Sequence, residues 1–259
     1  MLELLFGALA GSAVGFTLGL VGGGGSILAV PLMVYFVGVD DPHVAIGTSA
    51  LAVAANALIG LGSHARKRNV KWRCAATFAT AGVAGAWTGA MLGRAMDGQM
   101  LLALFALLML LVAGLMFRSR GRPGNPAVVL NRGNALKLLG SGAGTGLLSG
   151  FFGIGGGFLV VPGLIASTGM PILFAVGSSL VAVAAFGLTT ALSYASAGLV
   201  DWPIAAVFIA GGAIGSLSGT RLATRLADRK GVLTLVLAGL IIFVALYMLY
   251  RTAGELGWT

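Results

Sequence analysis

The sequence predicts an all-α polytopic membrane protein built from two inverted-topology repeats, each a glycine-broken helical hairpin followed by three transmembrane helices. Three observations predict this class. Of the 259 residues, 58% are hydrophobic and only 9% are charged, and the mean hydropathy is +1.01, so there are too few charges to cover a water-exposed surface. Apolar stretches of membrane-spanning length alternate with short polar loops. Two of these stretches are interrupted by glycines at matching positions, which is a pointer to the binding site of a transporter.

The first apolar stretch, 2–37, contains Gly22-Gly23-Gly24-Gly25-Ser26. Each glycine costs a helix about 1 kcal/mol relative to alanine, so four in succession end a helix. The stretch is too long for one span and short for two full ones. It therefore predicts a hairpin of two short or tilted helices that turns at the glycines. Because lipid cannot pair the backbone groups left free there, the turn must be buried in protein or line a wet cavity.

The remaining elements occur in the same order in both halves. We predict a first repeat over 1–118, a cytoplasmic linker over 119–135 and a second repeat over 136–251. In the first repeat, a hairpin over 2–37 is followed by spans at 44–64, 73–94 and 100–117. In the second repeat, a hairpin over 136–167 is followed by spans at 172–195, 203–222 and 232–250.

Matching residues indicate that the second half is a duplicate of the first. At an offset of 131, the positions Gly15, Gly19, Gly22, Gly24, Gly25 and Pro31 match Gly146, Gly150, Gly153, Gly155, Gly156 and Pro162. After one deletion the offset becomes 130, and the matches continue with Gly47-Thr48-Ser49 and Gly177-Ser178-Ser179, then Trp72 and Trp202, then Gly82, Gly85, Gly89 and Gly212, Gly215, Gly219.

The distribution of charges predicts that the two copies have opposite orientations. Cytoplasmic loops carry an excess of lysine and arginine. The first half has a basic loop at 66–73, whereas the matching loop at 194–201 has no basic residue. When loops are counted alternately, all but two of the 16 lysines and arginines fall on one side. Both chain ends then lie outside a bacterial inner membrane, and the tips of the two hairpins can meet within it.

Glycines also recur every fourth residue on several predicted helices. Such stripes let helix backbones approach closely. Packing within the chain is the simplest use of these stripes, and a homodimer interface is the alternative. The stripes are Gly7, Gly11, Gly15 and Gly19; Gly85, Gly89 and Gly93; Gly142, Gly146 and Gly150; and Gly211, Gly215 and Gly219.

The glycine breaks and nearby polar residues form the predicted substrate site. A helix that restarts after a break presents free N–H groups and the positive end of its dipole, which suit an anion. Serine and threonine hydroxyls near the breaks can donate to the same anion, although such hydroxyls also commonly bond to a carbonyl of their own helix. The predicted substrate-binding residues are Gly22, Gly23, Gly24, Gly25, Ser26, Thr48, Ser49, Asn56, Gly153, Gly155, Gly156, Gly157, Ser178 and Ser179.

Several other functions are disfavoured by the residues present. The glycine strings lack the Gly-Lys-Ser/Thr of a phosphate-binding loop, and no catalytic triad, zinc motif or embedded carboxylate pair is found, so we predict no enzyme activity, no cofactor and no metal. The net charge of +9 does not indicate nucleic acid, because the basic residues follow the membrane topology. The ionisable residues, including His43, His64 and Arg94, lie near predicted helix ends, where they are expected to act as interfacial anchors.

The duplicated pattern from Gly15 to Pro31 and from Gly146 to Pro162, followed by Gly-Thr/Ser-Ser and then Val-x-Trp, resembles the TauE/SafE sulfite exporter family of membrane permeases. The resemblance covers nearly the whole chain. It implies transport of sulfite, sulfonates or related sulfur-containing anions across the bacterial inner membrane. One departure is Asn56, which is matched by Phe186 in the second copy, so a site built there is not symmetric.

The expected function is that of a secondary transporter, and specifically an exporter, of a small sulfur-containing oxyanion. The anion is held at the paired breaks, and one half rocks against the other to alternate access. A passive anion channel and a non-transporting membrane assembly protein are the alternatives. The expected partners are the anion and the lipid bilayer.

Overall fold

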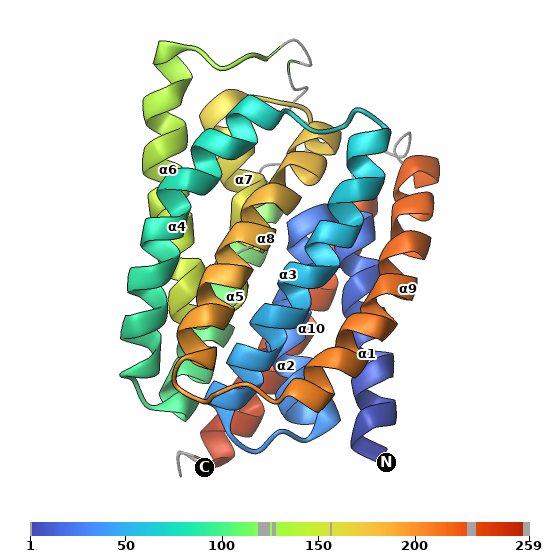
Figure 1. Cartoon of the computed structure of the whole chain (residues 1–259), viewed down its shortest axis with the longest axis vertical. Coiled ribbons are helices and arrows are strands. Elements are labelled where there is room, and N and C mark those ends of the chain that lie inside the picture. The colour runs from blue at the N-terminus through green and yellow to red at the C-terminus, as the bar shows by residue number, and fades with distance from the viewer. Residues whose placement is uncertain (1, 119–124, 126–127, 156, 227–231, 256–259) are drawn as a thin grey trace.

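The computed structural model describes residues 2–118, 125, 128–155, 157–226 and 232–255, and these residues are helical almost throughout. Figure 1 shows long helices that run roughly along the longest axis of the molecule. In the first half, the α-helices are α1 (Leu2–Val21), α2 (Ala29–Leu32), α3 (Pro42–Arg66), α4 (Trp72–Arg94) and α5 (Gly98–Arg118). In the second half they are α6 (Arg132–Phe152), α7 (Gly157–Thr168), α8 (Ile172–Ala195), α9 (Trp202–Leu226) and α10 (Val232–Glu255).

The chain reverses direction after α1. Gly22 has a φ of +68°, a left-handed conformation that glycine adopts without steric cost. The chain continues as the 3₁₀-helix η1 (Gly22–Leu28), then α2, then the π-helix η2 (Met33–Val37). The rings of Phe6 and Phe36 lie 5.1 Å apart, so η2 ends beside the start of α1.

The chain also reverses direction after α6. A capping box between Asn131 and Asn134 starts this helix, and Gly153, with a φ of +66°, ends it. Helix α7 then runs back along α6. This direction brings Ser167, near the end of α7, beside Ser141, in the first half of α6, and their hydroxyl oxygens are 2.6 Å apart. The left-handed glycines Gly22 and Gly153 occupy matching positions of the two halves.

The closest helix contacts join elements from different halves. Helix α1 packs most extensively against α9, and α4 packs against α6. A side chain on Gly11 would overlap the backbone of Phe208, and one on Gly15 would overlap Gly212. Since both numbers increase together along the contact, α1 and α9 run parallel.

The contact between α4 and α6 has the same direction. A side chain on Gly146 would overlap Gly82, and one on Gly150 would overlap Ala86. The glycine stripes are thus used for backbone contact within one chain. A homodimer through the same faces would have to displace these contacts.

Helices α3 and α8 pack against each other, and so do α5 and α10. At one end of the molecule, α3 and α9 finish together, and Lys67 Nζ donates to the Thr220 carbonyl at 3.5 Å. At the opposite end, the start of α5 lies against the start of α3, since a side chain on Gly98 would contact Pro42. Helix α1 begins and α10 ends at this opposite end (Figure 1).

Four helices in the described part of the chain are long and apolar enough to cross a membrane. They are Glu3–Val21, Pro42–Arg66, Ile172–Ala195 and Trp202–Leu222. Large apolar side chains also face outward, such as Leu9 at 53%, Ile214 at 73% and Phe243 at 70% exposure. Such a surface would be unfavourable in water and is compatible with lipid. The all-helical membrane class predicted from composition is therefore confirmed.

Candidate functional site

The two glycine breaks contact each other through bare backbone. A side chain on Gly23 would overlap the backbone of Gly157, and a side chain on Gly157 would overlap the Gly23 carbonyl. The Gly23 N–H donates to Ser179 Oγ on α8 at 3.2 Å. All three residues are buried. The structure thus brings one element of each predicted hairpin and one predicted hydroxyl to a single point.

Each break also rests on the first turns of a neighbouring helix from the other half. Gly22 lies against Val176 on α8, and Gly153 lies against Ile46 on α3. Gly155, with a φ of +64°, faces Val53 and Gly187. Gly25 packs back onto Thr17 and Leu18 of α1. Of the other predicted glycines, Gly24 lies within η1 and Gly156 lies outside the described residues.

Three predicted hydroxyls bond to carbonyls close by in the chain. Ser26 Oγ donates to the Gly23 carbonyl at 2.9 Å. Ser49 Oγ donates to Ile46 at 3.0 Å, and Ser179 Oγ donates to Val176 at 2.8 Å. This is the common local use of a buried helix hydroxyl. Because each proton is already shared with a carbonyl, the hydroxyl would have to turn before it could donate to a ligand.

Thr48 and Ser178 connect helices of different halves. Thr48 Oγ1 accepts a hydrogen bond from the Asp201 N–H at 2.9 Å, just before α9. Ser178 Oγ accepts one from the Lys71 N–H at 2.8 Å, just before α4. A helix start leaves N–H groups without partners inside the helix, and these two hydroxyls lie beside such starts. They therefore position α9 and α4 against α3 and α8.

Asn56 is the predicted site residue with the least satisfied side chain. It is fully buried, and neither its Oδ1 nor its Nδ2 has a hydrogen-bond partner in the described part of the chain. The amide lies against Gly212, where any side chain would overlap it. Phe186 occupies the matching position of the second half and lies in the same way against Gly82.

Sequence reasoning did not single out Tyr194, which lies in the last turn of α8. Its side chain is fully buried, and its hydroxyl has no partner among the described residues. The available signal was the repeat offset of 130, which pairs Tyr194 with His64. His64 was expected to be an interfacial anchor, but the structure buries it completely at the end of α3, and neither of its ring nitrogens has a hydrogen-bond partner in the described residues.

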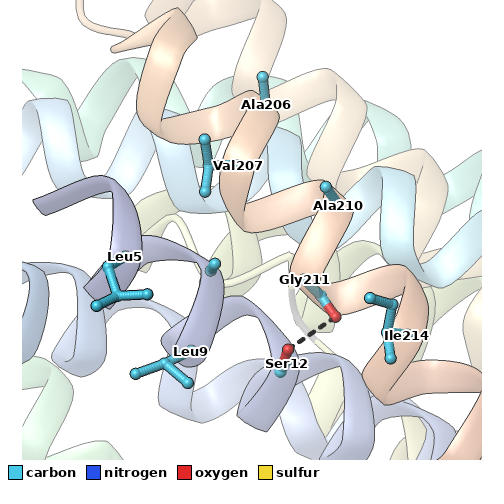
Figure 2. Close-up of a pocket in the computed structure, with 9 residues that line it drawn as sticks. Leu5, Leu9, Ser12, Ala206, Val207, Ala210, Gly211 and Ile214 are labelled. Atoms are coloured by element: carbon cyan, nitrogen blue, oxygen red, sulfur yellow. Dashed lines mark hydrogen bonds between the residues drawn. The ribbon is translucent and has the colours of Figure 1, made fainter. Parts of the chain in front are cut away.

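A surface groove of about 470 Å³ lies between α1 and α9. Figure 2 shows its lining, which is apolar apart from Ser12, whose Oγ donates to the Gly211 carbonyl at 3.0 Å. None of the predicted site residues lines it. The groove is therefore separate from the glycine breaks. As for metals, no group of three or more His, Cys, Asp or Glu that could hold an ion is present in the described residues.

Comparison with known proteins identifies the family. Residues 7–248 match the family model described as sulfite exporter TauE/SafE. A probable membrane transporter protein of Xylella fastidiosa strain 9a5c is 51% identical over 252 residues, with 95% of each chain covered.

More distant relatives carry the same description. A probable membrane transporter protein of Methanocaldococcus jannaschii is 26% identical, covering 91% of this chain and 93% of the relative. One of Bacillus subtilis is 24% identical, covering 96% of each. No solved structure matches the chain. The chain therefore belongs to the TauE/SafE sulfite exporter family and is a membrane transporter, not an enzyme.

Proposed function

We propose that this transporter exports a small sulfur-containing oxyanion, such as sulfite or an organosulfonate, by secondary transport. The observation that carries the proposal is the contact between Gly23 and Gly157, with Ser179 beside it. Two helix breaks that meet without side chains leave bare backbone at a buried point. The name of the family model supports sulfur oxyanions as the substrate class.

Backbone amides are the chemical basis of the proposed site. The first turn of α7, from Gly157, leaves N–H groups that have no carbonyl partner within the helix, and the helix dipole adds positive potential there. Glycine permits close approach of a ligand to these groups. In this proposal the amides of both breaks, the hydroxyls of Ser26, Ser49 and Ser179, and the Asn56 amide bind the anion. Thr48 and Ser178 do not bind the anion directly in this proposal. They hold α9 and α4 in position around it.

We also propose that the two halves are inverted relative to each other. Parallel packing supports this. Helix α1 matches α6 in the repeat, and α4 matches α9. Copies of the same orientation would place α1 antiparallel to α9, whereas inverted copies place them parallel, as the order of contacts from Gly11 to Phe208 and from Gly15 to Gly212 requires.

The charges at the two ends support an orientation in a bacterial inner membrane. Arg66 and Lys67 lie at the end where α3 and α9 finish. Asp41, Asp97 and Asp201 lie at the opposite end, where each caps a helix. Under the positive-inside rule the first end is cytoplasmic. Both chain ends would then be outside, since α1 begins and α10 ends on the acidic side.

The proposed mechanism is alternating access with moving units that differ from the sequence halves. The glycine contacts join α1 to α9 and α4 to α6, so one half cannot rock as a rigid body without separating close-packed backbones. We propose instead that α1 with α9 forms one unit and α4 with α6 the other. One break follows α1 and the other follows α6, and the two meet at Gly23 and Gly157. In this proposal, displacement of one unit against the other would open the breaks to one side at a time.

Counterflow in proteoliposomes tests this function. Vesicles loaded with unlabelled sulfite should accumulate radiolabelled sulfite transiently, and excess taurine, sulfoacetate or sulfate should rank as competitors. Ser179→Ala removes the hydroxyl beside Gly23 and should lower the initial rate about tenfold, the scale of one lost hydrogen bond to a charged group. Ser218→Ala, a more peripheral serine on α9 that bonds within its own helix, is the matched control.

Two outcomes would contradict the proposal. Flux that is linear in concentration and shows no counterflow would indicate a passive channel. The absence of flux for every sulfur oxyanion, with a melting temperature unchanged by all of them, would favour an assembly protein whose glycines only pack helices.

A further inference from the structure

Three polar side chains from three helices converge at the acidic end of the molecule. The ring of Tyr194, in the last turn of α8, lies 6.2 Å from the ring of His43 at the start of α3. The guanidinium carbon of Arg94, the last residue of α4, lies 5.9 Å from the Tyr194 ring centroid. We refer to His43, Arg94 and Tyr194 as the Tyr194 cluster.

Each member of the Tyr194 cluster has a buried polar atom without a partner. Tyr194 Oη, His43 Nδ1 and Arg94 Nε find no hydrogen-bond partner in the described chain. The second ring nitrogen of His43 lies 3.1 Å from the Met96 carbonyl. An unsatisfied buried donor or acceptor typically costs about 1–3 kcal/mol, so three within one small region require an explanation. A bound ligand that supplies the missing hydrogen-bond partners is a direct explanation.

The chemistry of the cluster favours a negatively charged ligand. Arg94 is a permanent cation with donors in a planar fork, and the tyrosine hydroxyl is a second donor. The carboxylates at this end already accept from backbone amides: Asp41 from the His43 N–H at 2.7 Å and Asp97 from the Met100 N–H at 2.9 Å. These bonds hold the carboxylates at helix starts, where the helix dipole offsets their charge. Asp41 also lies close enough to act electrostatically on Tyr194, but Arg94 Nε and the Tyr194 hydroxyl have no partner among the described residues and can donate to an anion.

The cluster lies next to the second glycine break. Ile46 of α3 packs against Gly153, and the next residue, Gly47, packs against Tyr194. The cluster is therefore separated from the break by a single turn of α3. This short separation places the cluster beside the break on the side of the acidic end.

We propose that His43, Arg94 and Tyr194 form a second oxyanion site on the acidic side of the glycine breaks. The identity of the anion rests on the proposed function, but the existence of the site does not. A free sulfite and the phosphate of an anionic lipid share the chemistry that the cluster would recognise, and the experiment separates the two.

The test measures sulfite binding by the full chain in phosphatidylcholine nanodiscs, from the rise of melting temperature with sulfite concentration. Arg94→Gln should weaken binding about tenfold and Tyr194→Phe several-fold, the scale of hydrogen bonds to a charged group. Arg94→Lys should restore part of the affinity. Tyr194→Phe without ligand should melt no lower than the wild type, because it removes only an unpartnered hydroxyl. Arg66→Gln, an exposed arginine at the other end, is the control.

Other arms identify the ligand and separate this inference from the proposed function. If phosphatidylglycerol in the nanodisc stabilises the wild type but not Arg94→Gln, while sulfite has no effect, the site holds a lipid phosphate. If Arg94-dependent sulfite binding occurs without flux in proteoliposomes, the second site stands and the proposed function fails. If flux is normal and neither Arg94→Gln nor Tyr194→Phe changes sulfite affinity, the second site is ruled out.

Discussion

At the scale of single residues, the informative positions are buried polar groups that the protein itself does not satisfy. Asn56 is such a group, with both amide atoms buried and unpartnered within the described chain. An unsatisfied amide in the interior is unfavourable for folding. It lies against Gly212 of α9, and under the proposed function the amide serves to bind the anion and not to stabilise the fold.

Replacing Asn56 separates these two roles. Asn56→Ala should leave the melting temperature unchanged or raise it, since relief of an unsatisfied amide, about 1–3 kcal/mol, offsets the small cavity created. The rate of sulfite flux should fall about tenfold or more if the amide binds the anion. Differential scanning fluorimetry and proteoliposome flux on the same preparation provide both measurements.

Asn134→Ala is the contrasting control, because Asn134 belongs to the exposed capping box of α6. It should lower stability by about 1 kcal/mol and leave flux unchanged. A fall in stability for Asn56→Ala with normal flux would show that the buried amide is structural.

Predictions for single residues were limited because a buried hydroxyl can either bind a ligand or form a hydrogen bond with the protein itself. The sequence marks Thr48, Ser49, Ser178 and Ser179 as symmetric polar positions, but it cannot say which acceptors and donors surround them. The structure assigns Thr48 and Ser178 to the amides of Asp201 and Lys71. Those partners lie about 150 and 100 residues away in sequence, beyond the reach of any local pattern.

At the scale of elements, the parallel contacts of α1 with α9 and of α4 with α6 depend on glycine. At each crossing, carbonyl oxygens of one helix occupy the position where the partner would carry a side chain. Association of helices in lipid depends on such close packing, because lipid tails are as apolar as the helix surfaces and the hydrophobic effect does not drive the helices together. Glycine at every fourth residue is thus the sequence signal for these two contacts.

Two glycines on α6 offer a matched test of this packing. Gly146→Leu would drive its side chain into the backbone of Gly82 and should destabilise the protein by about 3 kcal/mol or more, at or above the usual range for overpacking. Gly144→Leu has no neighbour within 4 Å of the added Cβ and should be neutral or stabilising. Melting temperatures in detergent measure both, and equal losses for the two variants would contradict the packing.

The sequence indicated where α1 and α6 end but not which conformation the chain adopts after each end. Gly22 and Gly153 adopt the same left-handed conformation, as their repeat positions suggest. After Gly22 the chain forms a 3₁₀-helix, whereas after Gly153 it soon enters α7. The Ser26 hydroxyl, bonded to Gly23, stands where the second copy has Gly157. The two copies therefore differ in both residue type and helix type after the matching left-handed glycines.

At the scale of the whole molecule, the two halves interpenetrate. Each half contributes one member to each of the closest helix pairs. The sequence suggested two repeats that move as units, because repeats are visible in a chain while contacts between them are not. The parallel direction of the contacts, which supports the proposed inversion, required coordinates.

Site-directed labelling tests the inverted orientation. In a Cys74→Ser background, Ala197→Cys should react with a membrane-impermeant maleimide in intact bacteria, while Arg68→Cys should react only after permeabilisation. Both positions are exposed, and they lie in loops at opposite ends of the molecule. Glu3→Cys, exposed near the start of α1, should behave like Ala197→Cys. Labelling of positions 68 and 197 from the same side would refute the inversion.

The pairing of α1 with α9 has a consequence for how the protein is made. Ser12 bonds to the carbonyl of Gly211, a residue 199 positions later in the chain. Ribosomes synthesise a chain starting from its N-terminus, so α1 and its glycine face are made long before α9, the helix against which they pack. During that interval an insertase, a chaperone or lipid must cover the glycine face of α1. We therefore expect chains that end before residue 202 to be degraded faster than the full-length chain.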